Sequence, residues 1–155
     1  MDIEERVRRL EDREAIKELR ARYCYLADAG EWKAWSGLFT DDAQGIFEGF
    51  GTADGREGFL KYGIEVVAAQ FPFLKHMVHN EIIEVDGDSA TGKWYFDVPC
   101  VSAPDSPAFG GGKDGWLQGT YDEKYRREGS EWKICQLTAS FQFVAGLREG
   151  WKDQV

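Results

Sequence analysis

Histidine and cysteine are both scarce in this sequence. The chain of 155 residues has two histidines, His76 and His79, and three cysteines, Cys24, Cys100 and Cys135. The cysteines lie far apart and form no C-x-x-C pair, so we interpret them as reduced packing residues and not as a disulfide framework or a zinc site. Two histidines and scattered carboxylates also lack the spacing of metal ligands.

Basic residues and long apolar runs are scarce as well. The sequence has 19 Lys and Arg against 28 Asp and Glu, which gives a formal net charge of -9 and repels phosphate backbones and anionic membranes. No apolar run approaches the roughly 20 residues of a membrane span. The amino terminus opens charged, without the apolar segment of a secretory signal. We therefore expect a cytoplasmic protein that binds neither nucleic acid nor membranes.

Several sequence motifs of cofactor and nucleophile sites are missing too. The chain has no G-x-G-x-x-G after a strand, no Walker loop and no G-x-S-x-G, and we expect an enzyme that works without a cofactor. Aromatic residues, in contrast, are abundant: 6 Trp, 6 Tyr and 10 Phe. They predict a folded protein with an aromatic interior or cavity. The length is close to that of one domain, so we expect residues 1–155 to form a single domain.

The first third of the chain has helical periodicity. A first helix is predicted from residue 2 to about residue 29, ending at Gly30, and a short second helix over Glu31–Phe39. The apolar face of the first helix carries Val7, Leu10, Ile16, Leu19, Tyr23 and Leu26. We expect the second helix to bury Trp32, Trp35, Leu38 and Phe39.

The next segment predicts a strand and a third helix. The strand is expected over Ala43–Phe50, before a glycine-rich turn over Gly51–Gly55. Asp54 and Glu57 resemble a capping box, which would open a helix running to about residue 70, before Pro72.

From residue 74 onward the pattern is that of strands joined by tight turns. Four strands are expected, over Leu74–Val85, Ala90–Val101, Trp116–Arg127 and Glu131–Val144. Residues 102–115, rich in proline and glycine, predict a mobile loop. Helices followed by antiparallel strands indicate an α+β fold in which the sheet curls round a helix.

Both histidines fall on the strand predicted over Leu74–Val85. Histidine is the only side chain whose unperturbed pKa lies between about 5 and 8, so these two are the candidates for proton transfer. Alternation would place His76 on one face and His79 on the other, so only one can face the interior. The expected neighbours are Val78, Asn80 and Ile82 for His76, and Met77, Glu81 and Ile83 for His79. From these residues alone, the favoured interpretation of each histidine is a half-buried structural residue held by a neighbour's hydrogen bond.

Two groups of segments resemble a known family. The first comprises Leu10–Ile16, Arg22–Tyr23, Asp28, Trp32 and Leu38–Ala43; the second comprises His76-x-x-x-Asn80, Ile83–Ala90, Tyr125–Gly129 and Trp132–Ile134. In this order they resemble the SnoaL-like branch of the nuclear transport factor 2-like superfamily. The resemblance implies a cone of curved antiparallel, partly mixed sheet, closed by three N-terminal helices around a deep pocket. It specifies the fold better than the reaction, because the superfamily includes dehydratases, isomerases, polyketide cyclases, lyases and binding modules.

Within the branch, the spacing of Tyr23, Asp28 and His76 is similar to that of bile-acid 7α-dehydratases and, more distantly, scytalone dehydratases. The resemblance implies that His76 is the acid/base, Asp28 its partner and Tyr23 a donor to the substrate. Proton removal next to a carbonyl needs such a base, a carboxylate that fixes its tautomer and a donor where enolate charge develops. From periodicity alone, however, Tyr23 is a core residue, and an ideal helix places it roughly 140° from Asp28. Both would reach one pocket only if the helix end unwinds or the pocket straddles it.

Aromatic strand residues are candidates for the pocket lining. We expect Trp94, Phe96, Trp116 and Phe141 to bind an apolar aromatic or polycyclic substrate, although ordinary core packing is the alternative. Asp97 either lines the pocket or faces water.

The predicted function is that of a lyase, a dehydratase that acts by His/Asp proton abstraction and β-elimination. An isomerase, a cyclase or a non-catalytic binding or assembly module of the same fold is the alternative. An open curved sheet also predicts a homodimer or a higher homo-oligomer through its outer face.

Overall fold

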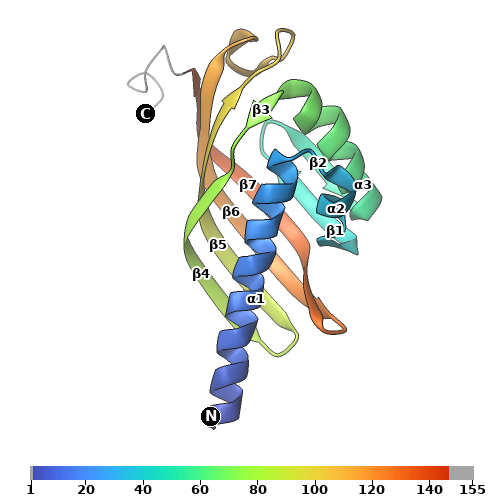
Figure 1. The fold of residues 1–155 in the computed structure, drawn as a ribbon, viewed down its shortest axis with the longest axis vertical. Helices are drawn as coiled ribbons and strands as arrows, with labels where there is room; N and C mark the ends of the chain where they lie inside the picture. The colour runs from blue at the N-terminus through green and yellow to red at the C-terminus, as the bar shows by residue number, and fades with distance from the viewer. Residues whose placement is uncertain (1, 147–155) are drawn as a thin grey trace.

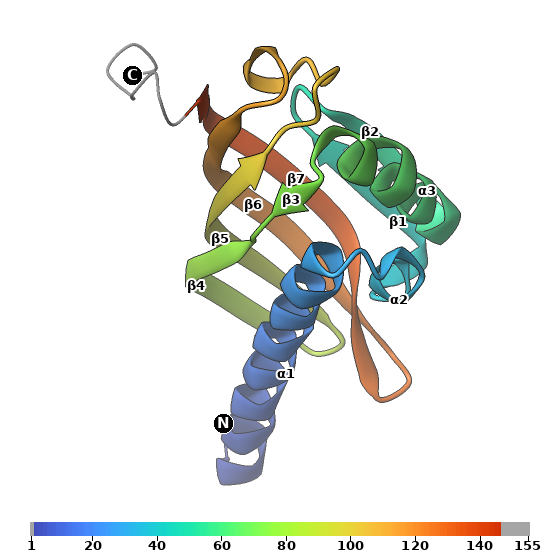
Figure 2. The same cartoon turned by 45° about the horizontal axis from the view of Figure 1, so that its top comes forward.

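The computed structural model describes residues 2–146, which form a curved sheet with helices gathered on its inner side (Figures 1 and 2). The helices are α1 (Ile3–Asp28), α2 (Trp32–Ser36) and α3 (Gly55–Tyr62), and α3 continues into a π-helical segment, η1 (Gly63–Ala68). The strands are β1 (Phe39–Phe47), β2 (Gly51–Asp54), β3 (Phe73–Leu74), β4 (Met77–Asp86), β5 (Ser89–Val101), β6 (Asp114–Glu128) and β7 (Glu131–Gly146). A short 3-10 turn, η2 (Ala108–Gly110), lies in the loop before β6.

The sheet has seven strands in the order β2-β1-β7-β6-β5-β3, and β4 also pairs with β5. All pairs are antiparallel except β1 with β7, which are parallel. The tight turns after β4 and β6 use Gly87 and Gly129, both with positive φ, and the two expected hairpins are confirmed. The predicted α+β fold with a curved mixed sheet and N-terminal helices is therefore confirmed.

Helix α1 runs along the lower part of the sheet in Figure 1 and extends past it at its amino end. The Asp2 side chain accepts the amide of Glu5, and the helix ends where Gly30 takes a φ of 70°. The prediction that Val7 and Leu10 belong to the buried face is wrong: both are exposed, Leu10 to 62%. The reason is that the first turns lie beyond the sheet, and the buried face begins only at Asp12.

Two predicted elements near β1 are wrong in their bounds. The short second helix stops at Ser36, and Phe39 belongs instead to β1, where it pairs with Ile134 of β7. The predicted turn after β1 is largely strand β2, which pairs with β1 from Gly51 to Asp54. The capping box is also absent, because Asp54 ends that strand and its side chain makes no capping bond to α3.

The strand predicted over Leu74–Val85 is divided into β3 and β4, with Lys75 and His76 in the link between them. Asn80 has a φ of 56°, and the pairing with β5 is interrupted between His79 and Ile82. This irregularity corrects the predicted faces: Ile83 is buried and Ile82 exposed, whereas His79 is exposed before the interruption. His76 therefore lies inside and His79 outside, as expected, but the alternation does not continue past Asn80.

The inner side of the sheet and the helices share an aromatic core. Phe39 and Phe59 stack with ring centroids 3.7 Å apart, and Trp35 packs edge-on against both. Trp32 lies so close to Gly63 that a Cβ there would be 2.5 Å from the indole, so η1 can approach α2 only with glycine at this position.

Within residues 2–146 no helix is both long and apolar enough to cross a membrane.

Candidate active site

An apolar cavity of about 60 Å³ lies between the inner face of the sheet and the helices. The side chains that line it come from α1, α2, α3, η1 and the strands, and they are mostly aromatic or aliphatic. They include Tyr23, Trp35, Tyr62, His76, Phe96, Tyr121 and Phe141. His76 is the one residue of this lining whose ordinary pKa is near neutrality.

His76 is held by Asp28 through both its ring and its backbone. The Nδ1 atom lies 2.7 Å from Oδ1 of Asp28, and the His76 amide donates to Oδ1 and Oδ2 at 3.0 and 3.2 Å. The side chains of His76 and Asp28 are only 10% and 8% exposed. Because an ionised carboxylate can only accept, Nδ1 carries the proton of the neutral imidazole and Nε2 is its basic nitrogen.

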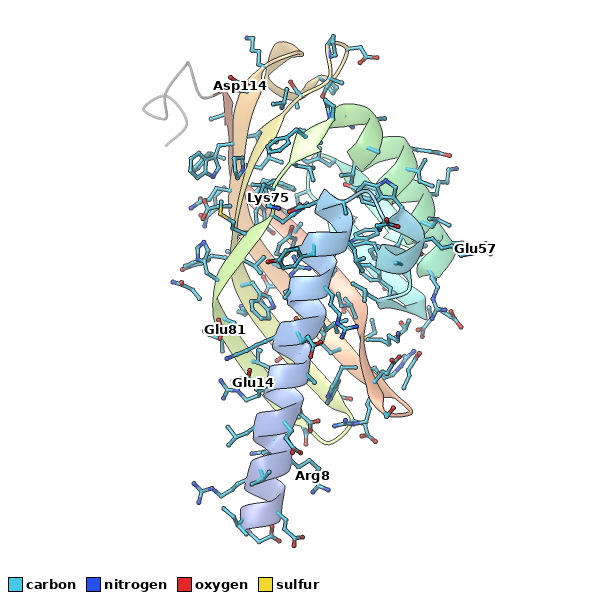
Figure 3. The ribbon with its side chains drawn as sticks, in the orientation of Figure 1. Arg8, Glu14, Glu57, Lys75, Glu81 and Asp114 are labelled. Carbon is cyan, nitrogen blue, oxygen red and sulfur yellow. The ribbon has the colours of Figure 1, made fainter. Side chains whose placement is uncertain are left out.

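Asp28 is the last residue of α1, where a negative charge is disfavoured by the helix dipole. Besides His76, it has the ammonium of Lys75 3.6 Å from Oδ2. Figure 3 places Lys75 on the link beside the end of α1, where it is open to solvent. The two residues before β4 thus supply an amide, an imidazole and an ammonium group to one carboxylate.

Tyr23 reaches the cavity without any unwinding of the helix. Its ring lies 6.0 Å from the His76 ring, at 86° to it. Helix α1 remains regular as far as Asp28, which does not line the cavity but faces a surface groove behind His76. His76 therefore lies between Tyr23 and Asp28. The two residues can both contact it although they are about 140° apart around the helix.

A buried charged pair lies behind Tyr23, and the sequence reasoning missed it. The Arg20 guanidinium is sandwiched between the rings of Tyr23 and Tyr121, at 3.8 and 3.9 Å from their centroids. It also lies 2.9 Å from Glu123, and both side chains are fully buried. Burial raises the pKa of Tyr121 to about 12, against the opposing charge of Arg20.

Glu123 continues the polar cluster away from the cavity. It accepts the hydroxyl of Tyr125, which in turn accepts the indole N–H of Trp94 at 2.9 Å. Burial raises the pKa of Glu123, although the attraction of Arg20 opposes this. The spacing contained a signal for this cluster, since Arg20 lies one helical turn from Ile16 and from Tyr23, on the buried face.

The predicted lining residues divide into two groups. Phe96 and Phe141 line the cavity, whereas Trp94 is buried beyond it in the Glu123 cluster. Asp97 and Trp116 also lie outside, and the expectation that Trp116 lines the pocket is wrong. Both are on the outer face of the sheet, because they alternate with the inward-facing residues of β5 and β6, and the Trp116 indole donates to Asp97 at 3.0 Å.

A thin wall separates the cavity from the surface groove at Asp28. Five residues line both spaces, and we call them the shared wall: Ala27, Trp32, Val67, Phe71 and Leu74. Four of them lie on helices or in a loop, and Leu74 lies on the shortest strand, β3. Within residues 2–146, no group of three His, Cys, Asp or Glu side chains is placed to hold a metal ion.

The fold and the site define a class of protein, an α+β cone with a buried histidine–aspartate pair at an apolar cavity. The chain belongs to the SnoaL-like domain family, whose model matches residues 8–138. The uncharacterized protein Rv2910c of Mycobacterium tuberculosis is 31% identical over 99 residues, which are 64% of this chain and 67% of that protein.

Solved structures share the fold over most of the chain. The hexachlorocyclohexane dehydrochlorinase LinA-type3 of Novosphingobium barchaimii has a TM-score of 0.80 and 24% identity, covering 90% of this chain and 92% of the other. A putative scytalone dehydratase of Novosphingobium aromaticivorans has a TM-score of 0.75 and 20% identity, covering 87% of each chain. An NTF2-like protein with a cystatin-like fold from that organism has a TM-score of 0.70 and 27% identity, covering 90% of this chain and 87% of the other. Two of these neighbours are thus described as enzymes of the lyase type.

Proposed function

We propose that the protein is a cofactor-independent lyase that removes a proton from a small apolar, ring-bearing substrate and expels a β-leaving group. The observation that carries this proposal is the buried pair of His76 and Asp28 at the wall of an apolar cavity. A positioned base of this kind, kept away from bulk water, suits the removal of a proton next to a carbonyl. The lyase-type neighbours of the same fold are consistent with it.

The mechanism uses one histidine for two proton transfers. Nε2 of His76 takes the proton from the carbon next to a carbonyl, and Asp28 stabilises the imidazolium that forms. Charge develops on the carbonyl oxygen, and the Tyr23 hydroxyl donates a hydrogen bond to it. The imidazolium then returns the proton to the departing β-hydroxyl, which leaves as water. A carbon–carbon double bond forms, and His76 is again neutral.

The proposal is tested with a panel of β-hydroxy ketones, including aromatic and steroid-like compounds. Loss of water and exchange of the α-proton into deuterated solvent are followed by NMR. His76→Ala should lose at least about 10²- to 10⁴-fold in rate, since positioned acid/base catalysis contributes that much. His79→Ala is the matched control and should retain the rate. Equal turnover by wild type and His76→Ala would refute the assignment.

The same panel separates the alternative functions. Proton exchange without loss of water would indicate an isomerase or a cyclase. Binding without exchange or elimination would indicate a non-catalytic ligand-binding module of the same fold.

We also propose that the protein forms a homodimer or a higher oligomer through the outer face of the sheet. No described helix covers this face in Figures 1 and 2, and Met77, Ile82 and Tyr95 are exposed on it. Sedimentation at micromolar concentration should therefore give a mass above the 17.6 kDa of the chain. Ile82→Lys should shift the mass toward the monomer, and a wild type that sediments as a monomer would exclude this assembly.

A further inference from the structure

Arg20 is a fully buried cation directly behind the cavity. Its side chain is 0% exposed, and the guanidinium lies 3.8 Å from the ring centroid of Tyr23 and 3.9 Å from that of Tyr121. Both of these phenols line the cavity. The positive charge is thus separated from the cavity by one layer of aromatic side chains.

Stability alone is a poor explanation for this charge. A buried ion pair often stabilises a fold no more than well-packed apolar side chains of similar volume, because both charges lose their water. Arg20 lies 2.9 Å from Glu123, but none of its three guanidinium nitrogens has a hydrogen-bond partner of good geometry within residues 2–146. Buried donors that are left unpaired add to the cost, so a functional explanation is called for.

The ion pair is oriented with its positive end toward the cavity. Arg20 contacts the two phenols of the lining, whereas Glu123 accepts the hydroxyl of Tyr125, which lies beyond the lining together with Trp94. Two opposite charges at different distances do not cancel, so the cavity experiences a net positive potential from the pair. A fixed charge in a site that excludes water acts strongly on charge that develops there.

The charge of Arg20 acts on the two phenols that it contacts. Burial raises the pKa of Tyr23 and of Tyr121, and in each case the charge of Arg20 opposes the rise. Burial also raises the pKa of Tyr62, which lines the cavity but stacks on Phe47 and has no such cation against its ring. A nearby cation favours loss of a phenolic proton, so the same O–H donates more strongly to an anion.

We propose that Arg20 is a positioning residue that orients and polarises the phenols of Tyr23 and Tyr121, and thereby stabilises negative charge on an oxygen bound in the cavity. The inference deepens the proposed function and rests on it for the reaction, in which this oxygen is that of the enolate formed when His76 removes a proton. It names the substrate class as a carbonyl compound whose intermediate is an oxyanion. A halogenated hydrocarbon that eliminates without charge on oxygen would gain nothing from Arg20.

The test uses ring-fluorinated phenols, which have nearly equal shape but increasing acidity. They undergo no β-elimination, so binding is measured without reaction. Absorbance distinguishes the bound phenolate from the bound phenol, and the change in the ligand's own pKa on binding gives the ratio of the two affinities, which we call the oxyanion preference. Wild type should bind the phenolate at least as tightly as the phenol, whereas an apolar cavity without a cation would favour the phenol.

Variants of the two charges assign the oxyanion preference to Arg20. Arg20→Met should lower it by about 10-fold or more, because a nearby cation lowers the pKa of an acid by about 1 to 3. Glu123→Gln should raise it, because the opposing charge is removed while Arg20 remains. A purely structural role for the pair would change both variants in the same direction. Lys93→Met, which removes a cation from the outer face, is the matched control and should retain the wild-type value.

The stability of the variants is controlled separately. Arg20→Met/Glu123→Leu removes both charges and leaves neither unpaired, so it replaces Arg20→Met if that variant does not fold. It should also lower the oxyanion preference, because Arg20 is the charge nearer to the cavity. Fluorobenzene has no oxygen, and its affinity should be the same in wild type and in every folded variant.

The proposal is overturned if the oxyanion preference is unchanged in the variants that lack Arg20, or if Arg20→Met and Glu123→Gln change it in the same direction. Wild type that binds neither form at millimolar concentration would overturn it too. Failure of the proposed function looks different: the oxyanion preference and its dependence on Arg20 would be present, while His76→Ala left proton exchange unchanged.

Discussion

Two histidine–aspartate pairs, whose histidines are three residues apart in the chain, lie on opposite sides of the same sheet. In each pair a ring nitrogen is 2.7 Å from a carboxylate oxygen. The inner pair, His76 and Asp28, is nearly enclosed and borders the cavity, whereas His79 and Asp97 are 44% and 23% exposed. The outer carboxylate is also shared with Trp116. Equal distances therefore do not make equal sites, because burial and access to a cavity decide what a pair can do.

Neighbouring acids on β6 repeat the contrast between the two faces. Glu123 points inward to Arg20 and is fully buried, whereas Asp122 points outward to Lys93, 3.1 Å away and exposed. Removing the partner of a buried charge costs much stability, whereas removing the partner of an exposed charge costs little. Four predictions test this contrast between the inner and the outer face.

The largest effect is expected at the inner ion pair. Arg20→Met should lower the free energy of unfolding by about 3–5 kcal/mol, because Glu123 would be left as an unpaired buried charge. Lys93→Met on the outer face should change it by less than about 1 kcal/mol. Urea denaturation measures both. The double variant Arg20→Met/Glu123→Leu should recover much of the loss, and a deficit as large as that of Arg20→Met would contradict the explanation.

The second prediction concerns the two aspartates. If a substrate is found as described above, Asp28→Asn should reduce kcat by about 10³-fold, since the carboxylate fixes the tautomer and balances the imidazolium. Asp97→Asn should leave kcat within a factor of about two, because surface substitutions away from the site have small effects. Comparable losses in both variants would mean that the inner pair is not the reaction centre.

A smaller effect is expected for the phenol of Tyr23. Tyr23→Phe should reduce kcat by about 10²-fold, which is the value of one donor to a developing oxyanion. Tyr95→Phe, on the outer face, provides the matched loss of a hydroxyl and should be neutral. An unchanged kcat in Tyr23→Phe would reduce Tyr23 to a packing residue.

The smallest effect is expected at an exposed pair and only in acid. Hydrogen bonds from Arg126 lower the pKa of Asp42 to about 2. The pair therefore contributes stability above the unfolded pKa of about 3.9, and this contribution is lost as the pH falls toward 2. Asp42→Asn should flatten that part of the stability profile, as measured by acid titration with circular dichroism, and should have little effect at pH 7. If Asp42→Asn leaves the stability profile at acid pH unchanged, the pair contributes nothing to stability there.

The fold was readable from the sequence because periodicity and turn residues agree with one another. Gly30, Gly87 and Gly129 mark the helix end and the two hairpins where they occur. The faces of β4 were less predictable, because the backbone irregularity at Asn80 has no signature in side-chain alternation.

The candidate site was only partly predictable. A resemblance could pair Asp28 with His76 across 48 residues, but no local pattern could, since the contact depends on how α1 docks on the link between β3 and β4. Trp35 was expected to be buried, and it is. That the Arg20 guanidinium lies between two phenol rings is a property of the assembled core, which no sequence period encodes.

The shared wall has a consequence for how such a protein can change over generations. The proposed catalytic pair is anchored on α1 and on the link before β4, whereas Trp32, Val67 and Phe71 lie on or next to α2 and η1. Substitutions in the wall can alter which molecules pass and fit, while His76 and Asp28 keep their positions. If the proposed function holds, the chemistry and the choice of substrate are separable traits in this chain, open to independent selection or to redesign.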